Sequence, residues 1–147
     1  MSLEARDSAD RAEQLILLTK RLTDLIERET ELFRARRPLE AAPFRDEKAK
    51  LANIYRQETA RISREPALIA DAPEALRKQL SETTEAFHAA LDAHGQAIAT
   101  LQELSEGLVK SIADYVAQSR MAETGYGPGA KLAPNRAGAA ITLDQSA

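Results

Sequence analysis

Glu85 and His88 are the residues of this chain whose types and spacing come nearest to a metal-binding pair. A glutamate and a histidine three positions apart share one helix face, and carboxylate-bridged di-iron bundles use this spacing. Those sites take a second such pair from another helix, whereas this chain has 2 histidines, the other being His94. Six residues place His88 and His94 about 240° apart around a helix. The spacing therefore predicts no metal site.

Patterns for nucleophilic catalysis and phosphate binding are not evident either. The chain has no cysteine, so thiol chemistry is excluded, and its Ser, His and Asp residues follow no triad arrangement. The glycine-rich stretch GYGPG contains a proline and neither follows a strand nor opens a helix, unlike a phosphate-binding loop. We therefore predict that the protein is not an enzyme and uses no cofactor.

Two polar residues fall where the surrounding pattern is apolar. Glu29 interrupts a line of leucines, and His94 lies on the apolar stripe of a later segment. Interior polar residues of this kind are usually hydrogen-bonded to one another and fix the register of packed helices. We expect Glu29 to meet either His94 or Lys48.

The composition is that of long helices. Of the 147 residues, 44% are hydrophobic but only 4% are aromatic, with no tryptophan, and Ala, Leu, Glu, Arg and Lys dominate. The net charge is −3, and no basic stripe with interspersed aromatics occurs, which argues against nucleic acid as a partner. The polar start and the short aliphatic run LILL, against ~20 apolar residues for a span, predict a cytoplasmic protein without membrane insertion.

Three segments have helical periodicity, over residues 8–37, 44–64 and 74–122. Ser8 or Asp10 is suited to cap the first helix, the cluster RARR (34–37) suits its C-terminus, and prolines separate the three segments. We predict an all-α fold, an antiparallel three-helix coiled-coil bundle with a long third helix. Apolar residues at 3,4 spacing form the first seam, Leu15, Leu18, Leu22, Leu25 and Leu32, and the third, Leu80, Phe87, Leu91, His94, Ile98, Leu101, Leu108, Ile112 and Tyr115.

The helix lengths are unequal, which leaves part of the third helix without a neighbour. At 1.5 Å per residue the three helices are roughly 42, 32 and 73 Å long, so the last helix outruns the others after about residue 100. An apolar stripe left in water usually marks an interaction site. A foreign partner and a second copy of the chain both remain open. The predicted partner-binding residues there are Leu101, Leu104, Leu108, Val109, Ile112, Tyr115 and Val116.

The last 25 residues, 123–147, differ from the rest. They contain four of the six glycines and two of the six prolines, and cannot bury enough apolar surface to offset the entropy of ordering. We therefore divide the chain into a helical bundle, 1–122, and a disordered, flexible tail that binds a partner, 123–147. Tyr126, between two glycines, is the candidate anchor in this tail.

Three stretches together resemble a known family. They are the broken leucine ladder LTKRLTDLIERETELF, the segment EKAKLANIYRQE with Lys48 and Leu51, and the end of the long helix followed by TGYGPGAKL. The chain is similar in these stretches, over about residues 12–130, to the FlgN-type flagellar export chaperones.

This resemblance implies a cytoplasmic helical chaperone of the flagellar type III export apparatus. It would hold the terminal helix of hook–filament junction (hook-associated) proteins and keep them competent for export. The residues implied as contacts are Leu108, Ile112, Tyr115 and Val116 on the long helix and Tyr126 in the tail, which would also touch the export gate. The alternative is a structural coiled-coil protein that closes a homodimer and has no client.

Overall fold

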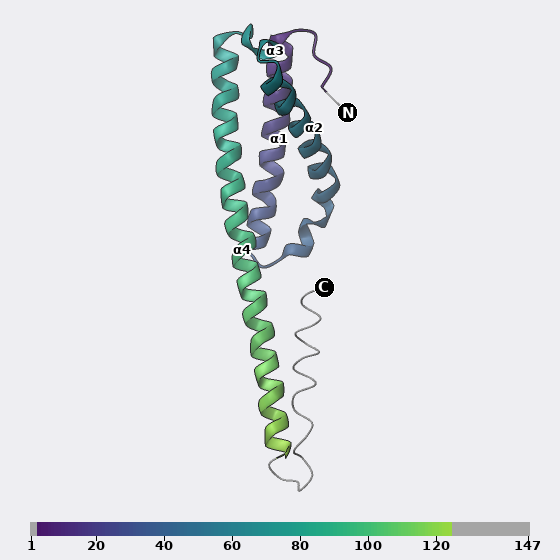
Figure 1. Cartoon of the computed structure of the whole chain (residues 1–147), viewed down its shortest axis with the longest axis vertical. Coiled ribbons are helices and arrows are strands. Elements are labelled where there is room, and N and C mark those ends of the chain that lie inside the picture. The colour runs from purple at the N-terminus through teal and green to yellow at the C-terminus, as the bar shows by residue number, and fades with distance from the viewer. Residues whose placement is uncertain (1–2, 125–147) are drawn as a thin grey trace. The chain divides into compact units, whose positions relative to one another are not determined.

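The computed structural model describes residues 3–124, and within this range every regular element is a helix, which confirms the all-α prediction. The elements in chain order are α1 (Ser8–Arg34), the 3-10 helix η1 (Pro38–Phe44), α2 (Arg45–Arg64), the short α3 (Ala67–Ala70) and α4 (Glu74–Thr124) (Figure 1). Tyr126 and the rest of the predicted tail beyond Thr124 lie outside the described residues.

Contacts within the chain separate two units, residues 1–99 and residues 100–147. Unit 1 contains α1, η1, α2, α3 and the first half of α4, and unit 2 begins with the second half of α4. The division follows from the helix lengths, since α4 has 51 residues whereas α1 has 27 and α2 has 20.

Three helices pack around one core in unit 1. Leu22 and Ile26 of α1 and Phe87 and Ala90 of α4 are buried together, and Leu51, Ala52 and Tyr55 of α2 pack against them. The Tyr55 and Phe87 rings meet edge to face with their centroids 4.9 Å apart, a favoured aromatic geometry. In Figure 1, α1 and this part of α4 run in the same direction, and α2 runs in the opposite one. The coiled-coil packing itself stays a prediction.

Four of the five leucines of the predicted α1 seam lie in the core, whereas Leu32, near the end of the helix, is half-buried. Leu15, Leu18, Leu22 and Leu25 are all buried, because 3,4 spacing brings them to one face of the helix.

The seam of α4 differs from the predicted one at Leu91, whose side chain is 41% exposed. Ala90 and Ala97 are buried in the core instead, and with Phe87 and His94 they restore a 4,3 spacing. Alanine at these positions leaves little side-chain volume between α4 and the helix that packs against it. Leu91 follows Ala90 by one residue, and so points about 100° away from that contact.

The first helix begins with a different cap from the predicted one. Asp7, rather than Ser8 or Asp10, is the N-cap, and its Oδ1 accepts a hydrogen bond of 2.8 Å from the Asp10 backbone N–H. Its extended backbone (φ −155°) suits this position, whereas Ser8 is already the first helical residue. The Asp10 carboxylate accepts from the backbone N–H of Arg6 instead, and this hydrogen bond lowers the pKa of Asp10.

The same helix ends at Arg34, three residues before the predicted end at 37, in a turn built from backbone hydrogen bonds. The Arg37 N–H donates to the Leu32 carbonyl at 2.8 Å and the Arg36 N–H to the Phe33 carbonyl at 3.0 Å. This is the Schellman motif, which requires a left-handed residue just after the helix. Arg36 fills that position with φ 61°, the one positive φ of a non-glycine residue between 3 and 124. The turn then leads into η1 at Pro38.

The start of α4 and both ends of α2 lie within one residue of the predicted positions, whereas the end predicted at 122 is not tested because the described residues stop at Thr124. The helix predicted over 44–64 is α2, from Arg45 to Arg64, and the segment between Pro66 and Pro73 contains the four-residue α3. The helix predicted over 74–122 is α4, which begins at Glu74 and runs through Gly95 to Thr124 as one element.

Arg36→Gly should stabilise the protein, by up to about 1 kcal/mol. Glycine adopts a positive φ without the steric cost that a side chain imposes, although it also gains entropy in the unfolded chain. Urea unfolding followed by circular dichroism would measure the change. Arg37→Gly, one residue later and outside the left-handed region, is the matched control and should not stabilise. A loss of stability in Arg36→Gly would contradict this explanation of the turn.

Candidate functional site

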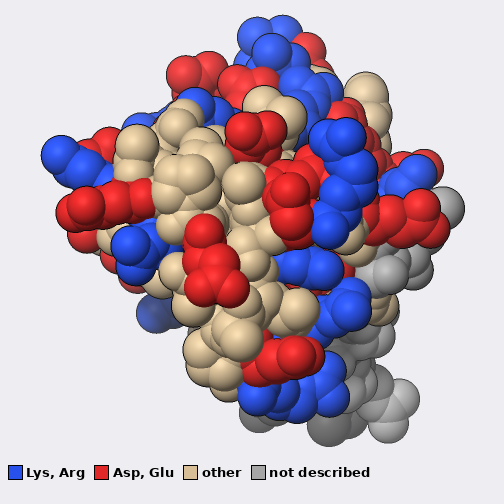
Figure 2. All heavy atoms as spheres, turned by 90° about the horizontal axis from the view of Figure 1, so that it is seen from above, with Lys and Arg blue, Asp and Glu red and all other residues tan. Residues whose placement is uncertain are grey.

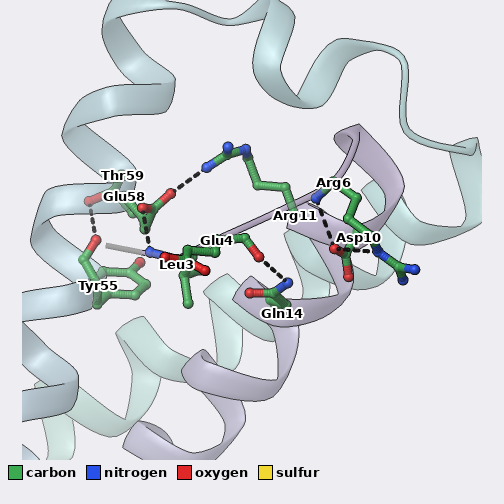
Figure 3. A network of polar contacts seen from close by, with 9 residues as sticks. All are labelled: Leu3, Glu4, Arg6, Asp10, Arg11, Gln14, Tyr55, Glu58 and Thr59. Carbon is green, nitrogen blue, oxygen red and sulfur yellow. Dashed lines mark hydrogen bonds and ion pairs between the residues drawn. The ribbon is translucent and has the colours of Figure 1, made fainter. Parts of the chain in front are cut away.

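The buried Glu58 of α2 joins three parts of unit 1. Its side chain is 1% exposed, and its Oε2 accepts a hydrogen bond of 2.7 Å from the guanidinium of Arg11 in α1, which is also buried. Its Oε1 accepts from the backbone N–H of Leu3 at 3.0 Å. Figure 3 shows these two donors meeting the one carboxylate, while Gln14 of α1 holds the neighbouring segment by donating to the Glu4 carbonyl. Both carboxylate oxygens are therefore paired.

A second buried carboxylate, Glu29, lies near the other end of α1. It accepts hydrogen bonds of 2.9 and 2.7 Å from the Lys48 ammonium of α2 and lies 3.0 Å from Nε2 of His94 in α4. The His94 ring also packs against Phe33 with centroids 5.4 Å apart. The prediction that Glu29 meets His94 or Lys48 is confirmed, and it meets both.

These polar groups are saturated by one another, so they offer little to a ligand. Among the described residues, every buried side-chain nitrogen or oxygen has a hydrogen-bond partner. Within the same range no group of three His, Asp or Glu side chains could hold a metal ion. The chemistry that the two pairs support is structural: each joins α1 to α2 by opposite charges.

Arg11 and Glu58 were not singled out from the sequence, although a signal for them exists. Arg11 precedes Leu15 by four residues on the seam of α1, and Glu58 lies between Tyr55 and Ile62 on the apolar side of α2. A charged residue that falls on the apolar face of a helix is expected to be buried, as was predicted for Glu29. The same burial affects Tyr55, whose pKa is raised by desolvation.

At the surface, charges of both signs are mixed. Arg21 of α1 reaches Glu47 of α2 at 2.7 Å, and this hydrogen bond lowers the pKa of the Glu47 carboxyl. Figure 2, the view onto the end that carries α3, shows acidic and basic side chains interleaved there around uncharged ones. No large surface of one sign appears in this view.

The apolar residues that face water gather in unit 2. Leu104, Leu108, Ile112 and Tyr115 are exposed, Leu108 by 63% and Tyr115 by 71%. At 100° per residue these four positions fall within about 80° of one another around α4. The opposite side of this stretch carries Glu103, Glu106, Lys110 and Asp114. We call the four exposed side chains, Leu104, Leu108, Ile112 and Tyr115, the apolar arc.

The other residues predicted to bind a partner flank this arc or lie beyond the described range. Leu101, Val109 and Val116 are half-buried, and Tyr126 falls outside residues 3–124. The seven predicted residues between 101 and 116 thus lie within about 140° of one another around α4. Their role as a binding site stays a prediction.

No helix among the described residues is both long enough and apolar enough to cross a membrane. The apolar arc lies on a helix whose opposite side carries charged residues.

The described residues form an all-helical protein that exposes an apolar face on its longest helix. A relative from Caulobacter vibrioides, named flagellar basal-body protein FlbY, is 43% identical over 149 residues, and the match covers the full length of both chains. The chain therefore belongs to the family of the flagellar basal-body protein FlbY. It matches no family model and no solved structure.

Glu58→Ala should destabilise unit 1 by about 3–5 kcal/mol, because it leaves the Arg11 guanidinium buried without its acceptor and also removes the acceptor of the Leu3 N–H. Urea unfolding followed by helical circular dichroism would measure the change. Glu47→Ala, which removes an exposed carboxylate from the same helix, is the control and should leave the midpoint nearly unchanged. Equal effects of the two variants would show that the buried pair does not hold the helices together.

Leu108→Asp combined with Ile112→Asp should lower the unfolding free energy by less than about 1 kcal/mol, the scale of the difference in helix propensity. Leu22→Ala, in the core of unit 1, should cost about 2–5 kcal/mol. The same unfolding experiment compares the two. A large loss of helix in the Asp variant would mean that the arc belongs to a core rather than to the surface.

Proposed function

We propose that the chain takes part in flagellar assembly as a binding module, and that its apolar arc holds a helical segment of another flagellar protein. Two facts support this proposal. The relative is named a flagellar basal-body protein, and the chain matches it from end to end. The arc leaves four large apolar side chains in water on one side of α4.

The exposed arc is the observation that carries the proposal. A line of apolar residues at 3,4 spacing is the surface that a second amphipathic helix covers, with its own side chains placed between those of the first. Burying a leucine or isoleucine side chain contributes roughly 1.5–3 kcal/mol, so a few of them can hold a partner with useful affinity. The interface stays small enough to be reversible.

In its finer form the proposal is that of an export chaperone of the FlgN type acting in the cytoplasm. The client would be a hook-associated protein, whose terminal helix is covered before export through the flagellar type III apparatus. The helical residues 1–122 would supply the bundle, and the tail, 123–147, would supply a second grip through Tyr126, which would also contact the export gate. The resemblance to that family and the exposed arc both support this form.

Calorimetric titration with a hook-associated protein from the same organism tests the proposal. The full chain should bind, and Leu108→Asp with Ile112→Asp should weaken binding by about 100-fold or more, given the burial energy of two such side chains. Gln102→Asp with Ala117→Asp adds the same two charges away from the arc and should bind like the parent chain. The affinity of Tyr126→Ala for the same client measures how much Tyr126 contributes to binding.

Light scattering on the same samples distinguishes the export chaperone from the alternative, a structural homodimer without a client. A stable dimer that Leu108→Asp with Ile112→Asp converts to a monomer, together with no heat on addition of the client, would make the arc an interface between two copies. The export-chaperone proposal would then be abandoned in favour of a structural homodimer without a client.

A further inference from the structure

A groove runs between α1 and α4 in unit 1, on a side to which α2 contributes no residue. Two adjoining hollows of about 540 and 460 Å³ form it, and both are lined by Glu27 of α1 and Ala86 of α4. On α4 the lining extends from Gln79 to Ala93, which corresponds to about 21 Å or four helical turns. We call this surface the α1–α4 groove.

The floor of the groove is made of small side chains. Ala86, Ala89, Ala90 and Ala93 of α4 line it, and Thr23 and Thr30 of α1 face them. Ala86 and Ala89 are exposed to water. Small residues allow a neighbouring helix to approach to the short end of the usual 8–10 Å between helix axes. The shape is that left for a fourth helix beside a three-helix core.

Acidic side chains border this floor. The groove is lined by Asp24, Glu27, Glu31 and Glu82, against Lys20 and Arg34. Asp24 is engaged by Arg21 and Arg28 of its own helix, whereas Glu27, Glu31 and Glu82 enter no ion pair among the described residues. Three carboxylates that enter no ion pair among the described residues therefore line the α1–α4 groove. They would attract a positively charged partner and raise its rate of association.

We propose that the α1–α4 groove binds one amphipathic helix of a partner protein, with small or medium apolar residues toward the alanines and Lys or Arg along its flanks. The charge pattern argues against a second copy of this chain joined groove to groove, since that contact would bring Glu27, Glu31 and Glu82 of the two copies together. The proposal goes beyond the proposed function, because the groove lies in unit 1 and uses no residue of the apolar arc.

Two synthetic helices provide the probe. Each has about 14 residues, to match the length of the groove, and a hydrocarbon staple on its outer face keeps it helical. Both carry the same stripe of alanine and leucine. They differ only at the flanking positions, which are all Lys in one peptide and all Glu in the other. Fluorescence anisotropy with the full-length protein should detect binding of the Lys peptide, weakening as salt is raised, and at least about tenfold weaker binding of the Glu peptide.

Ala86→Arg with Ala89→Arg should weaken binding of the Lys peptide at least about tenfold, because it fills the floor and adds like charge. Ala49→Arg with Ala60→Arg makes the same change at exposed alanines of α2 and should bind like the parent chain. Leu108→Asp with Ile112→Asp should also leave this binding unchanged, which separates the groove from the arc.

Glu27→Lys with Glu31→Lys keeps the alanine floor and should reverse the preference in favour of the Glu peptide, so the test does not depend on how well the arginine variant folds. Equal binding of the two peptides to the parent chain, or no difference between the groove variant and its α2 control, would overturn the proposal. So would sedimentation showing a dimer that the groove variant dissociates, since the occupant would then be a second copy.

Discussion

Two ion pairs between α1 and α2, in which Arg11, Glu29 and Glu58 are buried and Lys48 is half-buried, are the constraint on which the arrangement of unit 1 depends. Arg11 near the start of α1 meets Glu58 near the end of α2, and Glu29 near the end of α1 meets Lys48 near the start of α2. If α2 ran the other way, Arg11 would face Lys48, and Glu29 would face Glu58. Withdrawing charges from water is costly unless each finds its partner, so this pattern selects the antiparallel pair. It also explains why α2 needs few apolar residues: two positions of its inward face are charged.

The seam between α1 and α4 follows a different principle. Phe87 and Ala90 of α4 are buried together with Leu22 and Ile26 of α1, and His94 of α4 meets Glu29 and Phe33 of α1. The alanines of α4 beside this contact are too small to fill the space next to α1, and they line the α1–α4 groove.

Much of this fold is readable from the sequence, because leucine spacing and proline positions are strong local signals. The leucines of α1, the break at Pro38 and the long α4 are where the pattern indicates.

Most of the features that the sequence pattern does not predict are set by contacts with residues far away in the chain. Ala90 carries too little apolar surface to reveal a core position, and Leu91 beside it suggests a false one. Asp7 rather than Ser8 is the N-cap because the backbone is still extended at Asp7 (φ −155°) and already helical at Ser8. The buried Glu58 becomes meaningful only once Arg11 is known to face it. Of the candidate partner-binding residues, the sequence indicates the apolar arc by spacing alone, but spacing contains no information about what covers it.

The uninterrupted course of α4 has a consequence for how the apolar arc comes to exist. Starting a helix is the costly step, whereas adding residues to an existing one costs little, and most helical stability in proteins comes from packing against neighbours. Residues 74–99 are held helical by the core of unit 1, and so act as the nucleus from which residues 100–124 propagate. The arc would therefore be assembled only in chains whose unit 1 has folded, and a chain that unfolds there would lose its apolar arc as well.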